Sequence, residues 1–126
     1  MANKKTILAV DDSPQSLEMI HSALGGEFSV RLAKSASLAM SALERAKADL
    51  ILMDIEMPGI TGFDVVDLIE KNPAVAGVPV IFVTSHATEA FVAEAVRRGA
   101  KDYIVKPYDP ELLRGKVRRA LGVAGG

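Results

Sequence analysis

Short apolar runs recur along the 126-residue chain, and each is followed by a segment whose apolar residues repeat at helical spacing. Residues 6–10, 50–53 and 79–83 are almost uniformly apolar, which is typical of strands buried on both faces of a sheet. Residues 28–33 alternate apolar and polar side chains, which predicts a half-exposed strand near a sheet edge. Residues 102–105 form a shorter, fifth predicted strand.

Helices are predicted after these strands by apolar residues every three or four positions and by capping residues at the ends. Ser13 caps the first helix and Pro14 suits its first turn, while His21 falls on the apolar face as a structural residue. The second helix begins at Ser35 or Ser37, and Ala46 is its last inward residue. The predicted helices span residues 14–24, 35–46, 62–71, 89–98 and 110–121.

The alternation of strand and helix predicts an α/β fold with a parallel sheet, helices on both faces and right-handed crossovers. A (βα)5 flavodoxin-like sheet of order 2-1-3-4-5 is favoured, because it places the most apolar strands at the centre and the alternating strand at an edge. Residues 1–121 are expected to form one domain, and the glycine-rich segment 122–126 a flexible tail or the start of a linker.

Composition narrows the function only by exclusion. A formal net charge of −1 gives no reason to expect nucleic acid binding, and the absence of cysteine excludes disulfides and thiolate chemistry. No apolar run approaches the roughly 18 residues of a membrane span, and no signal-peptide core follows the N-terminus. We therefore expect a cytoplasmic protein that does not bind membranes.

Chemically active side chains follow most of the strands. Asp11 and Asp12 come after the first strand, Asp54 after the third, Thr84 after the fourth and Lys106 after the fifth. The carboxyl ends of parallel strands meet at one edge of a sheet, where ligands bind in open α/β folds. We therefore expect these five residues to lie together although they are distant in sequence.

The expected cluster fits phosphoryl chemistry. Three carboxylates in one place repel one another, and a hard divalent cation such as Mg²⁺ relieves that repulsion while leaving coordination positions for phosphate oxygens. Lys106 adds a fixed positive charge, Thr84 adds a hydroxyl donor, and the backbone N–H groups after Asp54 and Thr84 could supply further donors. Asp54 is ionised at neutral pH, so it needs no general base to attack phosphorus and form an acyl phosphate.

Each residue has a plainer interpretation when it is taken alone. Asp11 and Asp12 could cap a helix, Asp54 could be a turn residue before a proline, Lys106 could be a solvated surface lysine, and Thr84 could cap the fourth helix. The combination of all of them on one edge favours a shared site.

The chain resembles the receiver domain of two-component response regulators, in particular the single-domain chemotaxis-type regulators, over residues 5–121. The motifs that carry the resemblance stand in the family's order: Asp11-Asp12, Leu52-Met53-Asp54-Ile55-Glu56-Met57-Pro58-Gly59, Thr84 after Val-Ile-Phe-Val, and Tyr103-Ile104-Val105-Lys106-Pro107. By this resemblance Asp54 accepts the phosphoryl group, Thr84 and Lys106 hold it, and the bond before Pro107 is cis. Magnesium would be bound by the side chains of Asp12 and Asp54, by Asp11 through water and by the carbonyl of Glu56.

The resemblance also implies partners and a switch. The phosphoryl donor would be a phosphohistidine on a sensor histidine kinase or a histidine phosphotransfer protein. The partners that bind the switched domain would be a downstream protein target, an output domain or, after phosphorylation, a second copy of the chain. Thr84 would move toward the phosphoryl group and Tyr103 would rotate inward. The responding surface would comprise the fourth helix, the fifth strand and the fifth helix, with Phe91, Val92, Tyr103, Val105, Lys116 and Arg119 among its residues.

Glu56 and His86 each stand two positions after a site residue, where the family tunes the hydrolysis of the acyl phosphate. We expect these two side chains to set its lifetime by positioning or blocking the attacking water. The domain would catalyse only its own phosphorylation and dephosphorylation, and is not expected to be an enzyme acting on other substrates.

Other functions fit the motifs less well. A nucleotide-binding flavodoxin-like or Rossmann domain needs a glycine- or hydroxyl-rich loop after the first strand, where this chain has Asp11-Asp12. A dehalogenase-type phosphatase shares the aspartate nucleophile and Mg²⁺, but wants a second aspartate where this chain has Glu56. A phosphorylation-independent interaction module on the receiver fold usually lacks one of the acidic or lysine residues that are all present here.

Overall fold

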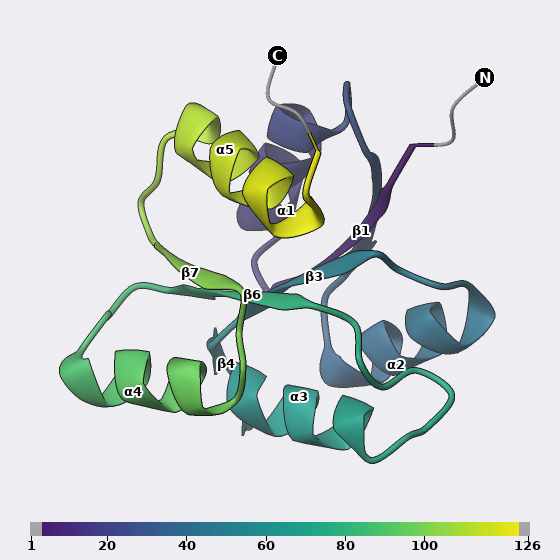
Figure 1. The fold of residues 1–126 in the computed structure, drawn as a ribbon, viewed down its shortest axis with the longest axis vertical. Helices are drawn as coiled ribbons and strands as arrows, with labels where there is room; N and C mark the ends of the chain where they lie inside the picture. Colours follow the sequence, from purple (N-terminus) through teal and green to yellow (C-terminus); the bar gives the residue numbers. More distant parts are fainter. Residues whose placement is uncertain (1–3, 124–126) are drawn as a thin grey trace.

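The computed structural model describes residues 4–123, and it shows a central parallel sheet with helices on both faces (Figure 1). The elements in chain order are β1 (Thr6–Val10), α1 (Pro14–Leu24), β2 (Ser29–Ala33), α2 (Ala36–Arg45), β3 (Leu50–Asp54), β4 (Glu56–Met57), β5 (Ile60–Thr61), α3 (Gly62–Glu70), β6 (Val80–Thr84), α4 (Glu89–Arg97), β7 (Asp102–Val105) and α5 (Pro110–Leu121). The part of the predicted tail at residues 124–126 lies outside the described residues.

The main sheet has the order β2-β1-β3-β6-β7, and its neighbouring strands are all parallel. Since β6 and β7 are the fourth and fifth of the predicted strands, the flavodoxin-like order is confirmed. Every residue of the central strands β3 and β6 is buried, whereas the edge strand β2 is largely accessible. The apolar runs and the alternating run therefore lie where their patterns indicated.

Two apolar clusters hold the layers together. Helices α1 and α5 cover one face of the sheet, and α2, α3 and α4 cover the other (Figure 1). Under α1 and α5, residues such as Ile7, Leu52 and Val117 pack into one cluster. On the opposite face, residues such as Leu8, Met53 and Phe82 pack into the second cluster. Because successive side chains of a strand point to opposite faces, the central strands contribute to both clusters, and the sheet is packed on both sides.

The helix starts follow the local sequence closely. The Ser13 hydroxyl accepts a hydrogen bond from the Ser16 amide at the start of α1, and Pro14 occupies the first turn. Ser35 caps α2, which settles the choice between Ser35 and Ser37. Asp109 caps α5. These caps hold the loops that lead from the strand ends into the helices.

Some local predictions were wrong. His21 is exposed, because the apolar face of α1 is completed by Leu17, Ile20 and Leu24 without it. Ala46 is the exposed C-cap of α2, and Ala42 takes the inward position instead. The helices α3 and α4 each end one residue earlier than predicted.

A short β4–β5 hairpin was not predicted. It pairs Glu56 with Thr61 and Met57 with Ile60 in an antiparallel register. Gly59 turns the chain between its strands with a φ of 77°, a conformation that glycine adopts without strain. The hairpin leads directly from the end of β3 into α3.

Within residues 4–123, the helices are all too short or too polar to cross a membrane.

Candidate functional site

The predicted site residues lie at the carboxyl edge of the main sheet. Asp54 ends β3 and pairs in register with Val83, while Thr84 ends β6 beside Val105. Asp11 directly follows β1, and its position is fixed because its amide donates to the Ala33 carbonyl. The parallel topology therefore gathers side chains from the ends of β1, β3 and β6.

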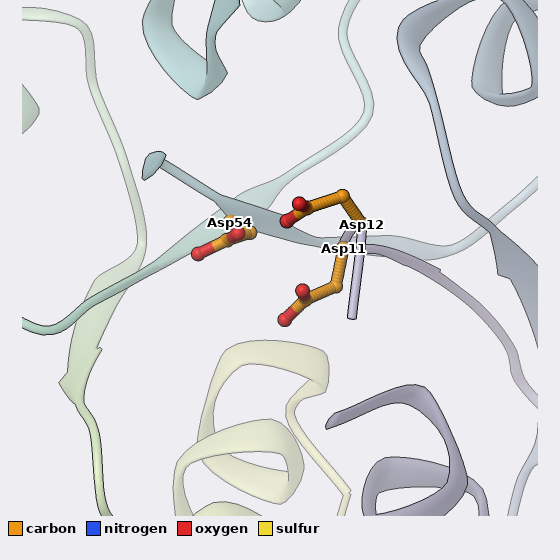
Figure 2. A group of neighbouring side chains, drawn as sticks. All are labelled: Asp11, Asp12 and Asp54. Atoms are coloured by element: carbon orange, nitrogen blue, oxygen red, sulfur yellow. The ribbon is translucent and has the colours of Figure 1, made fainter. Parts of the chain in front are cut away.

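The acidic residues Asp11, Asp12 and Asp54 form one cluster, and each has a carboxylate oxygen within 4.8 Å of one from the other two. Figure 2 shows their side chains gathered at the ends of β1 and β3. Asp11 and Asp54 are buried, whereas Asp12 is exposed. A group of carboxylates with one accessible member is a donor set suited to a hard cation that also keeps water ligands.

Lys106 links two of these carboxylates. Its Nζ donates to Oδ2 of Asp11 at 2.9 Å and lies 3.5 Å from Oδ1 of Asp54. The Ser16 hydroxyl of α1 lies 3.4 Å from the same nitrogen. Burial lowers the pKa of the Lys106 ammonium, but the two carboxylates outweigh burial, so the pKa lies above its ordinary value. Lys106 is therefore a permanently charged group at the site.

Asp54 is a buried carboxylate whose charge is only partly compensated. Its side chain is 2 % exposed, and Oδ1 is the buried side-chain atom that finds no hydrogen-bond donor among the described residues. Burial, with smaller contributions from the carboxylates of Asp11 and Glu56, outweighs the attraction of Lys106 and raises the pKa of this carboxyl to about 7. An additional cation at this place would satisfy the free oxygen and favour the ionised form.

The hydrogen-bond donors at the end of β6 contact Glu56. The Thr84 hydroxyl donates to Oε2 of Glu56 at 2.5 Å, and the Ser85 amide donates to Oε1 at 2.8 Å. The His86 amide donates to the Thr84 hydroxyl oxygen at 3.1 Å. The structure thus brings Glu56, Thr84 and His86 together, with the Glu56 side chain directed to Thr84 across 28 residues of sequence.

Tyr103 is half-buried on β7 and packs against Phe91, with the ring centroids 5.6 Å apart. The Lys116 ammonium lies 5.4 Å from the centre of the tyrosine ring and donates to the Tyr103 carbonyl at 2.8 Å. Phe91 was expected at the responding surface, but it is buried because it packs between Tyr103 and Phe63. Val105 and Arg119 are exposed there.

The segment after β7 completes the edge. The Lys106–Pro107 peptide bond is cis. An open hollow of about 460 Å³ beside it is lined by Ser16, Met19, Ser85, Lys106, Pro107 and Tyr108. The Ser85 amide is one of the backbone donors expected after Thr84, and its acceptor here is the Glu56 carboxylate. Sequence reasoning missed Ser16 and Tyr108, because it singled out neither the first turn of α1 nor the residue after Pro107.

Comparison with known proteins agrees with this geometry. The family model described as the response regulator receiver domain matches residues 7–118. The solved structure of the chemotaxis protein CheY4 of Vibrio cholerae superposes on this chain with a TM-score of 0.87. The two are 28% identical, and the match covers 94% of this chain and 99% of CheY4.

Curated relatives include longer proteins. A probable cyclic di-GMP phosphodiesterase of Vibrio cholerae is 34% identical over 116 residues, which are 92% of this chain and 26% of that protein. The DNA-binding response regulator MtrA of Mycolicibacterium smegmatis is 34% identical over 119 residues, which are 94% of this chain and 51% of that protein. The chain therefore spans between a quarter and a half of the length of these relatives.

Proposed function

The chain belongs to the response regulator receiver family of two-component systems, and from this membership and the site geometry we propose that Asp54 accepts a phosphoryl group in a Mg²⁺-dependent reaction. The observation that carries the proposal is the buried Asp54 carboxylate beside Lys106 and the other two aspartates, with one oxygen that finds no hydrogen-bond donor in residues 4–123. A buried carboxylate kept without full compensation is typical of a functional group rather than a structural one.

The nucleophile is an Asp54 carboxylate oxygen. It attacks the phosphorus of a phosphohistidine, so that a P–O bond forms, the P–N bond breaks and its electron pair returns to the imidazole nitrogen of the donor. Lys106 already lies within ion-pair distance of Asp54 and offsets negative charge on the transferred group. The Thr84 hydroxyl and the Ser85 amide are the nearby neutral donors for its oxygens.

The side chains of Asp12 and Asp54, Asp11 through a water molecule, and the Glu56 carbonyl would hold the magnesium ion. When bound, Mg²⁺ neutralises the clustered carboxylates and the developing charge on the phosphoryl oxygens. Asp11 is suited to an indirect role, because the Ser13 amide and Lys106 already bind its two oxygens. Asp54 retains the free oxygen.

The lifetime of the acyl phosphate is proposed to depend on Glu56 and His86. Both residues are exposed, and the Glu56 side chain and the His86 amide both contact the Thr84 hydroxyl. They would position or block the water that attacks the phosphorus. Replacing both residues and following loss of the phosphoryl group tests this role, and an unchanged hydrolysis rate would contradict it.

The phosphoryl donor is proposed to be a sensor histidine kinase or a histidine phosphotransfer protein in the cytoplasm. The proposed output is a change in Thr84 and Tyr103 that alters the surface of α4, β7 and α5, including Val92, Val105, Lys116 and Arg119. A downstream protein, an output domain or a second phosphorylated copy would bind this surface. The domain would catalyse only its own phosphorylation and dephosphorylation.

The proposed function is tested by incubating the protein with Mg²⁺ and a small acyl-phosphate donor and measuring the added mass. We expect one phosphoryl group on the wild type, none on Asp54→Asn, and none in the presence of EDTA. Glu18→Gln, which removes an acid on the exposed side of α1, is the control and should be labelled normally.

Two outcomes would contradict the proposal. Steady turnover of phosphate esters would indicate a phosphatase that uses the same nucleophile. Failure of the wild type to react with the acyl phosphate, or to bind a beryllium fluoride mimic, would indicate an interaction module that does not depend on phosphorylation.

A further inference from the structure

The carboxylate of Glu56 spans two hydrogen-bond donors at the end of β6. Its Oε2 accepts from the Thr84 hydroxyl at 2.5 Å, and its Oε1 accepts from the Ser85 amide at 2.8 Å. A carboxylate that binds adjacent donors through both oxygens resembles the way two oxygens of a phosphoryl group would bind them. The donors proposed to receive the phosphoryl group are therefore already occupied by an anionic group of the chain itself.

The two ligands cannot share these donors. A hydroxyl has one hydrogen, and the Thr84 oxygen also accepts from the His86 amide, which orients it. The Thr84 hydrogen can therefore point to Glu56 or to a phosphoryl oxygen, but not to both. The Ser85 amide likewise has a single hydrogen, so the phosphoryl group must displace Glu56 from both positions.

The contact is held from both sides. Glu56 belongs to β4, which pairs with β5, and Thr61 at the end of β5 forms a reciprocal capping box with Asp64 of α3. Thr84 is 1 % exposed and ends a fully buried strand. Glu56 itself is exposed, so its carboxylate regains water when it is released. The contact can therefore open without movement of the sheet.

We propose that Glu56 is an internal ligand that occupies the Thr84 and Ser85 donors in the unphosphorylated state and must be displaced on phosphorylation. This inference rests on the proposed phosphorylation of Asp54 and adds to it a competing contact. The competition weakens binding of the phosphoryl group and holds Thr84 in its resting position. It concerns occupancy of the donors, and is separate from the positioning of water during hydrolysis.

The test measures the affinity of the whole chain for beryllium fluoride at saturating Mg²⁺ by titration calorimetry. Glu56→Asp keeps the charge, but its shorter side chain cannot span both donors. Glu56→Ala removes the charge and the contact. We expect both variants to bind at least about tenfold more tightly than the wild type, because the loss of even one of the two competing charge-assisted hydrogen bonds corresponds to about that factor.

The Asp variant separates the contact from simple repulsion. If Glu56→Ala binds more tightly while Glu56→Asp binds like the wild type, the carboxylate acts only by its charge and the inference is wrong. Equal affinities for all three proteins would overturn it as well. Glu89→Gln, which removes an exposed acid in the first turn of α4, is the matched control and should bind like the wild type.

A second measurement does not require the mimic. The Ser85 amide resonance of the metal-free protein should shift upfield and exchange with solvent faster in Glu56→Asp, because the amide loses its carboxylate acceptor. Unchanged behaviour of this amide would contradict the contact. If no variant binds beryllium fluoride, the proposed function fails and this inference fails with it, whereas equal binding by all variants overturns only the inference.

Discussion

At the scale of single residues, Asp54 sets the electrostatics of the site. Its carboxylate is buried, and the opposing charge of Lys106 lies 3.5 Å away without donating a hydrogen bond to it. Burial and the neighbouring Asp11 carboxylate together outweigh that attraction, so the pKa of Asp54 rises from 3.8 to about 7. Without a metal ion, ionisation of Asp54 therefore opposes folding.

The first prediction concerns Asp54→Asn in the absence of metal. The protonated wild-type carboxyl favours the folded state fully below about pH 4, and this advantage is lost as the pH rises to about 7. Above pH 7 we expect Asp54→Asn to be more stable than the wild type, on the order of 2 kcal/mol in the free energy of unfolding. Urea unfolding in EDTA at several pH values between 4 and 8 measures the difference.

The sign of the pH dependence is the decisive result. The gain of Asp54→Asn should shrink as the pH falls from 7 toward 4, because the wild-type residue becomes neutral as well. A gain that is constant over this range would show that the pKa of Asp54 is not raised. Asp109→Asn, at the exposed N-cap of α5, controls for the loss of one negative charge.

At the scale of elements, the start of α3 is fitted against the backbone of Asp54. Gly62 is buried, and a Cβ at this position would overlap the Asp54 carbonyl oxygen and lie 2.9 Å from Cγ of Met53. The Gly62 amide also donates to the Ile55 carbonyl at 3.0 Å. The hairpin and α3 therefore hold the segment that carries Asp54, and a side chain at Gly62 would displace it.

The second prediction compares two glycine substitutions. We expect Gly62→Ala to lower the free energy of unfolding by about 2–3 kcal/mol, because the added methyl group meets backbone that cannot move aside. Gly115→Ala in the interior of α5 meets no atom within 4 Å, and should raise stability by about 0.5–1 kcal/mol through helix propensity. Thermal and urea unfolding measure both, and a neutral Gly62→Ala would disprove the close packing.

Some bounds of helices and strands can be predicted from local sequence patterns, whereas exposure and very short strands cannot. The bounds of β1, β7 and α5 follow from apolar runs and caps, which act over a few residues. The exposure of His21 does not, because helical spacing places it beside the apolar face while neighbouring helices decide which residues that face includes. The β4–β5 hairpin has only two residues in each strand, and so leaves no periodic pattern.

For the site, the sequence predicts the meeting of residues but not all their contacts. Asp11, Asp54 and Lys106 come together because parallel strands end at one edge, which the order of strands and helices already implies. The hydrogen bonds from Thr84 and Ser85 to the Glu56 side chain depend on rotamers and on the unpredicted hairpin. The Ser85 amide is expected as a donor from its place after Thr84, but its acceptor in the Glu56 side chain has no sequence signature, since every residue except proline carries such an amide.

At the scale of the whole molecule, the site exists only when the chain is folded. The hydrogen bond between Lys106 and Asp11 joins residues 95 positions apart, and the acidic cluster draws on both β1 and β3. An unfolded chain cannot present these groups together, so a cation that binds them stabilises the folded state alone. Binding at the edge of the sheet is thereby coupled to the stability of both cores.

The third prediction follows from this coupling and is measured by thermal unfolding. At a Mg²⁺ concentration 100 times its dissociation constant, the folded state gains about 2.7 kcal/mol, which for a domain of this size raises the Tm by roughly 10 °C. Asp12→Ala and Asp54→Ala should lose most of this shift, because each removes a proposed ligand, and Glu18→Gln should keep it. Salt of matched ionic strength without Mg²⁺ separates binding from screening. An equal shift in Asp54→Ala and the wild type would place the ion elsewhere and disconnect it from the proposed phosphoryl acceptor.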